Sequence, residues 1–395
     1  MKLSRLLCLG LCLLTFTGTA CAKKPTAPDT KKNGPVTAYM PRKLEGPVHL
    51  VWDWQAPGEA ASKLAQEKKL PGINVLSPSW FILSDTEGNI EVKNATTDYA
   101  PQAHAKGYRV WALITNGFDP DRTHGLLDNP AGRQKAAENL LQLARTYQLD
   151  GINLDFENIK PEDSDRLTAF VGKLSGVLKP AGYTVSIDVT VPSDNGNWSK
   201  CYNRKELAEQ VDYVMLMAYD EHHRLSNVAG SVASLPWVEQ GIQKTLLEVP
   251  KEKLVLGMPL YMRDWTVKED GTVSARTLSM PGARKRIRDH SLVPAWLSSE
   301  GQYYFEYKEQ GTLHKVWMEE GRSLALKNAL ISRYDLAGSA YWRKGLEEPE
   351  VWENAEAYTA GGGTLTHPQK TVRPTLTGHP TPDHQPLTTA PSPLA

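Results

Sequence analysis

The sequence predicts an α/β fold in which parallel strands close into a (β/α)8 TIM barrel. Through the body of the chain, residues 47–358, apolar segments of strand character alternate with amphipathic helical segments, and this alternation is typical of a parallel sheet. An open doubly wound sheet is the alternative, but no Gly-rich phosphate-binding loop supports it. The length of 395 residues suits one large domain with tails, or two medium domains.

Eight segments are expected to form the strands of the barrel. Each is a short apolar run bounded by turn or helix signals, which is the pattern of a strand buried on both faces. In chain order they are 49–54, 73–83, 109–116, 151–157, 184–191, 213–219, 254–261 and 338–342.

The segments between these strands carry helix signals. Pro130 follows the capping residue Asn129, and apolar residues at helical spacing continue through 136–147, so a helix is expected to begin at Pro130. A second repeat runs through 167–178 and is followed by Gly182, which favours a helix end.

The interval between the seventh and eighth strands breaks the alternation. Segments 302–307 and 313–318 flank turn residues at 308–312, which predicts a hairpin. Apolar residues between 324 and 334 then indicate the seventh helix. A small α+β insertion, at about 262–320, is therefore expected to stand as a wall over the mouth of the barrel.

Both ends of the chain are predicted to lie outside the barrel. Residues 1–22 have a charged start, an apolar core and a small-residue cleavage site, as export signals do, so we expect an extracellular or cell-envelope protein. Cys21 is either removed or becomes a lipidated first residue that tethers the chain to a membrane. Residues 23–46 are a flexible linker by composition, and 359–395 form a disordered tail rich in Pro, Thr and Gly.

Composition argues against several classes of protein. The formal net charge is zero, so a nucleic-acid partner is not expected. Two of the four cysteines lie in the apolar core of the export signal, and Cys201 and Cys21 cannot form a disulfide framework inside the domain. No spacing resembles a metal site, and His222 and His223 are interpreted as solvated loop residues. We expect a monomer that needs neither metal nor cofactor.

The stretch 150–157, D-G-I-N-L-D-F-E, carries the strongest functional signal. Alternate side chains of a strand share a face, so Asn153, Asp155 and Glu157 point the same way, about 6–7 Å from one to the next. At that separation two carboxyl groups shift each other's pKa. A half-exposed strand with a solvated polar face is the simpler interpretation, but neighbouring acids are disfavoured in strands unless they have a use.

The expected position of these acids is the right place for reacting groups, and cleavage of a glycosidic bond is one reaction that paired carboxyl groups perform. Active sites of such barrels lie at the C-terminal ends of the strands, where Asp155 and Glu157 are expected. Cleavage needs a proton donor for the leaving oxygen and a group that stabilises the cationic sugar carbon. Glu157 is the natural acid, with its pKa raised by Asp155. No second acid suits the role of nucleophile on spacing alone.

The stretch resembles the strand-four signature of glycoside hydrolase family 18, D-G-x-D-x-D-x-E, with Asn153 in place of the usual first inner Asp. Members of this family use the 2-acetamido oxygen of the substrate as nucleophile and form an oxazolinium ion. The resemblance implies that Glu157 is the acid and that Asp155 orients the acetamido N–H. Asn153 is expected to hydrogen-bond Asp155 without sharing its proton, which affects the pH optimum. Asp150 is expected to brace the strand start.

Two further strand ends match the family. Met217-Ala218-Tyr219-Asp220 matches M-x-Y-D, which implies that the Tyr219 hydroxyl donates to the acetamido oxygen. Trp342 fits the Trp that forms the floor beneath the reacting sugar. The residues expected to contact the sugar are Trp54, Asn116, Asn153, Met217, Asp220, Tyr261, Arg263 and Trp342, with Trp80, Trp317 and Glu319 as further candidates.

Within the family, segments 150–158, 218–222 and 235–239 resemble the bacterial spore-cortex and cell-wall N-acetylglucosaminidases. This implies an exported retaining glycosidase that cleaves β-1,4-linked N-acetylglucosamine in peptidoglycan or its fragments, with chitin oligomers as the alternative substrate. A non-catalytic sugar-binding protein and an anchored structural protein are the rivals from other classes. The presence of Glu157 argues against the first of these, and internal versus terminal cleavage stays open.

Overall fold

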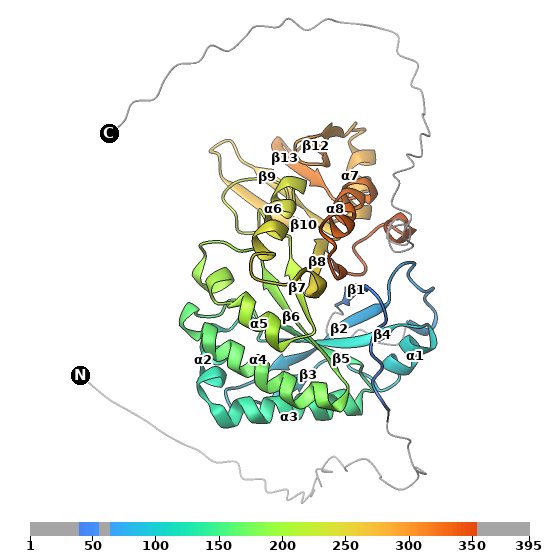
Figure 1. Cartoon of the computed structure of the whole chain (residues 1–395). Helices are drawn as coiled ribbons and strands as arrows, with labels where there is room; N and C mark the ends of the chain where they lie inside the picture. Colours follow the sequence, from blue (N-terminus) through green and yellow to red (C-terminus); the bar gives the residue numbers. More distant parts are fainter. Residues whose placement is uncertain (1–38, 55–63, 354–395) are drawn as a thin grey trace, which may run out of the picture. The chain divides into compact units, whose positions relative to one another are not determined.

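The computed structural model describes residues 39–54 and 64–353 (Figure 1). The predicted export signal with Cys21, most of the linker and the predicted tail lie outside the described residues. Within the described ranges, no helix combines the length and the apolar character that crossing a membrane requires.

Eight parallel strands form a closed barrel in the described part of the chain. Each strand pairs with the next, and β1 pairs with both β14 and β2, which closes the ring. The strands are β1 (Val48–Asp53), β2 (Val75–Leu83), β4 (Arg109–Thr115), β5 (Gly151–Asp155), β6 (Thr184–Thr190), β7 (Tyr213–Met217), β8 (Leu254–Pro259) and β14 (Gly338–Trp342). The predicted barrel is confirmed, and the open sheet is excluded because an open sheet has two unpaired edges.

Three strands end two residues earlier than predicted. β5 ends at Asp155 and β7 ends at Met217, so Glu157 and Tyr219 lie beyond their strands, at the rim. Tyr261 begins a separate strand, β9, rather than ending β8. Apolar residues continue beyond the end of each of these strands, and the sequence pattern therefore predicted the strand ends too late.

Helices cover the outer surface of the barrel, and α3, α4 and α5 lie along one side in green (Figure 1). As predicted, Pro130 begins α3, and the Asn129 side chain accepts from Gly132 N at 3.0 Å. Gly182, at φ +92°, follows the turn that ends α4, because glycine tolerates the left-handed region. The helices are α1 (Tyr99–Ala105), α2 (Pro120–Asp128), α3 (Pro130–Thr146), α4 (Ser164–Leu178), α5 (Arg204–Gln210), α6 (Leu235–Thr245) and α8 (Gly321–Tyr334), and a short strand β3 (Ile90–Val92) pairs with β2.

Asp150 braces the base of the barrel, as expected. Its buried carboxylate accepts from Val110 N at 2.9 Å and Arg42 N at 3.0 Å, and it lies 2.8 Å from His104 Nε2. Burying a carboxylate is costly unless hydrogen bonds replace its water. These contacts supply that replacement and tie the start of β5 to β4, so the functional end of β5 rests on a fixed base.

The insertion between β8 and α8 is a five-stranded antiparallel sheet with one helix. Its strands, in the order β10-β9-β13-β12-β11, include the predicted hairpin, with Gly311 in the turn at φ +81°. The elements are β9 (Tyr261–Val267), β10 (Val273–Ser279), α7 (Met280–Asp289), β11 (Ala295–Leu297), β12 (Gln302–Glu309) and β13 (Thr312–Met318). This sheet lies together with α7 at one end of the molecule as drawn, in yellow and orange (Figure 1).

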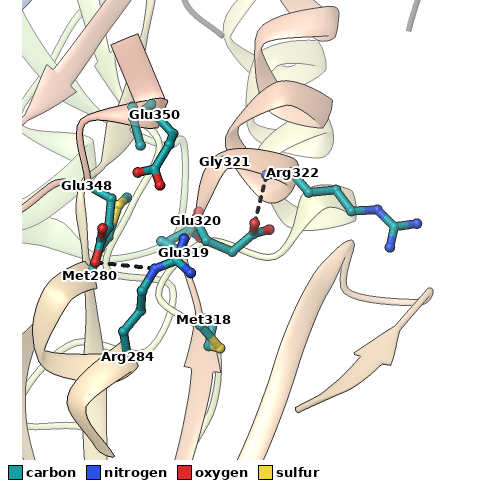
Figure 2. A pocket seen from close by; sticks show the side chains of 10 residues that line it. Met280, Arg284, Met318, Glu319, Glu320, Gly321, Arg322, Glu348 and Glu350 are labelled. Carbon is teal, nitrogen blue, oxygen red and sulfur yellow. Dashed lines mark hydrogen bonds and ion pairs between the residues drawn. The ribbon is translucent and has the colours of Figure 1, made fainter. Parts of the chain in front are cut away.

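A buried ion pair fastens the insertion to the barrel's last helix. Lys327 Nζ lies 2.9 and 3.0 Å from the two carboxylate oxygens of Glu319, and neither side chain is exposed. Figure 2 shows the adjoining cavity, of about 200 Å³, in which Glu348 pairs with Arg284 and Glu320 caps α8. Glu319, a candidate sugar contact by sequence, is therefore a structural residue, because its carboxylate is buried and paired.

Candidate active site

Four acidic residues gather at the C-terminal end of the barrel. Asp155 ends β5, Glu157 follows it, Asp188 lies on the adjacent strand β6, and Asp220 follows β7. Burial raises the pKa of Glu157 well above its usual range, and the charges of Asp155, Asp188 and Asp220 raise it further. The sequence predicted the grouping of Asp155, Glu157 and Asp220, but Asp188 was missed.

The main chain around Glu157 is held by buried polar side chains. Asn116 Oδ1 accepts from Glu157 N at 3.1 Å, and Asn116 Nδ2 donates to Glu157 O at 2.7 Å. Tyr202 Oη donates to Phe156 O at 2.8 Å. Asn116, expected from the sequence at the sugar, is completely buried, so its amide fixes the position of the acid instead.

Asp155 is buried with an unused acceptor. Its Oδ1 atom has no hydrogen-bond partner in the described part of the chain, and burial raises the pKa of the carboxyl to about 7. A buried carboxylate oxygen without a donor is costly. Such an atom is poised to accept a hydrogen bond from a ligand or to hold a proton.

Asn153 bonds differently from the prediction. Its Oδ1 accepts from Trp52 Nε1 at 2.8 Å and from Ser77 Oγ at 3.5 Å. Its Nδ2 donates to Ser186 Oγ at 3.0 Å and to Asp188 Oδ1 at 2.6 Å. The amide is therefore engaged at both ends inside the barrel, with no exposed surface. The expected bond to Asp155 and the expected contact with sugar are replaced by a bond to Asp188.

Asp220 is held at the rim by the first strand of the insertion. Tyr261 Oη and Arg263 Nη2 each donate to Asp220 Oδ1 at 2.6 Å, and Arg263 Nη1 donates to Thr277 Oγ1 at 2.6 Å. The predicted set of Asp220, Tyr261 and Arg263 is thus brought together, and β9 is what places it at the mouth.

Tyr219 lies between this cluster and the acids. Its ring packs edge-on against Tyr261, with 6.3 Å between centroids. Burial, and next the charge of Asp188, hold the pKa of the Tyr219 hydroxyl well above its usual range. The hydroxyl therefore stays protonated and can act as a donor.

Tryptophans from the last and first strands line the opposite part of the rim. Trp342 is half-buried at the end of β14 and packs edge-on against Trp52 with 5.8 Å between centroids. Trp54 is 41% exposed, with the Arg343 guanidinium 4.4 Å from its ring centre. Met217 is nearly buried, at 6%. Trp342 and Trp54 thus present aromatic surface, whereas Met217 offers little.

Trp80 takes no part in the site. It is 1% exposed, and its ring packs against Tyr99 of α1 and near Tyr147 beyond the end of α3, with centroids 5.0 and 5.7 Å away. Its side chain therefore points from β2 to the helix layer. The sequence placed Trp80 near a strand end correctly, but it did not show which face of the strand the residue occupies.

Two exposed aromatic residues near the acid were missed. Phe118, after β4, is 53% exposed, and Trp198, after β6, is 37% exposed, with 6.1 Å between ring centroids. The carbonyl of Phe118 accepts from Asn158 Nδ2 at 2.9 Å, and Asn158 is the residue next to the acid. A large aromatic residue just beyond a strand end was the available signal for Phe118. No such signal marks Trp198.

No group of His, Cys, Asp and Glu in the described ranges is arranged to hold a metal ion.

Comparisons with known proteins agree with the family resemblance that the sequence carries. The model of glycosyl hydrolases family 18 matches residues 59–346. The uncharacterized glycosylase YvbX of Bacillus subtilis is 27% identical over 306 residues, which cover 75% of this chain and 88% of that protein. The cortical fragment-lytic enzyme of Bacillus anthracis is 27% identical over 245 residues, 60% of this chain, and the match spans 56% of that enzyme.

A solved structure extends the comparison to the fold. The spore cortex-lytic enzyme SleL of Bacillus cereus superposes with a TM-score of 0.71 at 23% identity, covering 80% of this chain and 75% of that one. At this identity the likeness concerns the fold.

Proposed function

The chain belongs to glycosyl hydrolases family 18, and from this premise we propose that it cleaves β-1,4-linked N-acetylglucosamine in peptidoglycan fragments by substrate-assisted, retaining catalysis. It is a glycosidase with an N-acetylglucosamine-type substrate. The observation that carries the finer proposal is the grouping, at one end of the barrel, of Glu157, Tyr219 and an Asp155 oxygen without a partner among the described residues, with burial raising the pKa values of Glu157 and Tyr219.

Glu157 supplies the proton that the leaving sugar needs. Its raised pKa favours the protonated carboxyl, which is the state required of a general acid. The bonds from Asn116 hold its backbone, so the carboxyl is presented at a defined place. After the leaving group departs, the same carboxylate accepts a proton from the attacking water.

The substrate's own acetamido oxygen attacks the sugar carbon in this scheme. Asp155 Oδ1, which lacks a partner among the described residues, accepts the acetamido N–H and increases the electron density on the oxygen. The Tyr219 hydroxyl donates to that oxygen and fixes its direction. Attack gives an oxazolinium ion, and water then opens it with retained configuration.

The remaining groups bind the sugar. The Trp342 ring provides an apolar floor for the C–H face of the ring, and Asp220, held by Arg263 and Tyr261, accepts from a sugar hydroxyl. Phe118 and Trp198 offer a second aromatic surface beside the acid. We propose that these rings hold the sugar on the leaving-group side.

The choice of peptidoglycan rests on the cortical fragment-lytic relative. Because that enzyme is matched over 56% of its length, the substrate is part of the proposal, as is export to the cell envelope. Chitin oligomers share the same glycosidic bond and are the comparison substrate.

The deciding experiment compares the wild-type protein with Glu157→Gln on purified peptidoglycan and on chitin oligomers, with mass spectrometry of the products. The proposal expects cleavage after N-acetylglucosamine, no turnover by the variant and nearly unchanged sugar binding. Near-wild-type turnover by Glu157→Gln would overturn it. A protein that binds sugar without any turnover would be the lectin-like alternative.

A further inference from the structure

Asp188 is the one acid of the cluster to which the proposed mechanism gives no task. It is 1% exposed and lies inside the barrel on β6. Asn153 pairs with Ser186, and Leu154 with Ile187, across β5 and β6. Asp155 and Asp188 are therefore the next positions on two strands that run about 4.8 Å apart.

Both carboxyl groups point to the same side of the sheet. The Asn153 side chain bonds the side chains of Ser186 and Asp188, which places all three inside the barrel. Asp155 shares the face of Asn153, because alternate residues of a strand do. The two acids are thus buried lateral neighbours.

No positive charge balances this pair in the described part of the chain. The titratable groups close enough to interact with Asp188 are Asp155, Glu157 and Tyr219, and none of them is cationic. Arg263, the nearby cation, is committed to Asp220 at 2.6 Å. Two adjacent carboxyls without a cation cannot both ionise readily, so they retain a proton between them.

We propose that Asp188 is a positioning residue that shares one proton with Asp155 and so replaces, from the neighbouring strand, the acid that the usual signature carries at position 153. The inference rests on the proposed function of Asp155. When the acetamido N–H arrives, the proton moves from Asp155 to Asp188, and Asp155 becomes fully charged. No proton is gained or lost by the pair.

The identity of residue 153 fits this exchange. Trp52 Nε1 is a donor only, so it fixes the amide oxygen of Asn153 toward itself and the amide nitrogen toward Asp188. An ionised Asp at 153 could not donate to Asp188, and it would add a third acid to the cluster. Asn153 and Asp188 therefore form a matched set.

The electrostatics of the pair agree with a shared proton. Burial, and then the charge of Asp155, raise the pKa of Asp188 well above its usual range, against a smaller lowering by the Asn153 hydrogen bond. Burial raises the pKa of Asp155 to about 7. Such a pair titrates as a unit rather than as two separate residues.

The test measures kcat and KM against pH for the wild-type protein, Asp188→Asn and the exchange variant Asn153→Asp/Asp188→Asn. Asp188→Asn should lower kcat by about ten- to a hundredfold, with KM changed little. The reason is that the charge-assisted hydrogen bond from the Asp188 O–H to Asp155 is replaced by a weaker one from an amide. Removing the negative neighbour lowers the pKa values of Asp155 and Glu157, so the pH optimum should fall. The exchange variant, which returns the acid to β5, should recover kcat and the optimum.

Ser186→Ala is the matched control, since it removes the other acceptor of the Asn153 amide without removing an acid. It should keep the shape of the wild-type pH profile. A profile of Asp188→Asn equal to the wild type, or an exchange variant no better than Asp188→Asn, would overturn the shared proton.

A second measurement does not depend on turnover. The infrared spectrum of Glu157→Gln at neutral pH should contain a protonated-carboxyl band that is absent from the spectrum of Glu157→Gln/Asp188→Asn. The band is measured in the difference between the two spectra. Absence of that difference would refute the inference, even if the kinetic variants fold poorly. Turnover by Glu157→Gln would instead refute the proposed function, so the two failures are distinguishable.

Discussion

Replacing Tyr219 by Phe removes a single hydroxyl from the site and leaves its packing in place. The ring lies edge-on to Tyr261, and Phe presents the same edge. Burial and the charge of Asp188 raise the pKa of the hydroxyl well above its usual range, so in the proposed mechanism it is a full donor to the acetamido oxygen. The variant therefore isolates the contribution of that donor.

The expected loss follows from the charge that this donor serves. A hydrogen bond to a group that gains charge in the transition state contributes about 2–3 kcal/mol, and each 1.36 kcal/mol is about tenfold in rate. Tyr219→Phe should therefore lower kcat by about 30- to 160-fold. KM should change far less, because the donor acts mainly on charge that develops during attack.

The assay is steady-state hydrolysis of a defined N-acetylglucosamine oligomer, with the melting temperature of each variant measured alongside. Tyr261→Phe is the matched control, because it removes a hydroxyl that bonds Asp220 and so should raise KM more than it lowers kcat. If Tyr219→Phe changed KM alone, or if both variants behaved alike, the assigned role of Tyr219 would be wrong.

Three further outcomes are expected. Burial raises the pKa of Asp155 to about 7, so the folded protein keeps a proton that the unfolded chain has lost above about pH 4. The free energy of unfolding should therefore fall as pH rises from about 4 to 7. Asp155→Asn should flatten that slope in urea titrations at several pH values. Trp198→Ala should raise KM for long oligomers about threefold to tenfold while leaving the melting temperature nearly unchanged, since the ring is partly exposed and a stacked sugar is lost; an unchanged KM would remove Trp198 from the site. Lys327→Met should destabilise the fold by about 3–5 kcal/mol, because the buried Glu319 carboxylate loses its cation. Calorimetry of Lys327→Met/Glu319→Leu should show that most of that loss is recovered, and no recovery would contradict the pairing argument.

The barrel could be predicted because its signals are local. The apolar runs and caps that mark strands and helices, such as Asn129 before Pro130, are read within a few residues. The alternation of apolar and polar residues within 150–157 likewise predicts that Asp155 and Glu157 share one face. Family membership, through residues 59–346, agrees with that local signature.

The partners of these residues were not local. Asn153 and Asp188 are 35 positions apart in the chain, and Asn116 and Glu157 are 41 positions apart. The alternating pattern of β6 is that of any buried strand, so nothing around Asp188 marked it as part of the site. The same limit misplaced Trp80, whose position near a strand end says nothing about the direction of its side chain.

The sequence by itself predicted the succession of strands, the acids at and just beyond the end of β5 and, through the family signature they belong to, the class of bond proposed for them, because side-chain alternation and motifs are properties of short segments. Only the tertiary structure decided which groups tune that acid. Closing the barrel sets β5 beside β6 and turns Asp155 and Asp188 into neighbours, and folding the insertion back brings Arg263 to Asp220. Electrostatic interactions depend on distance in space, and distances between strands exist only after the ring has closed.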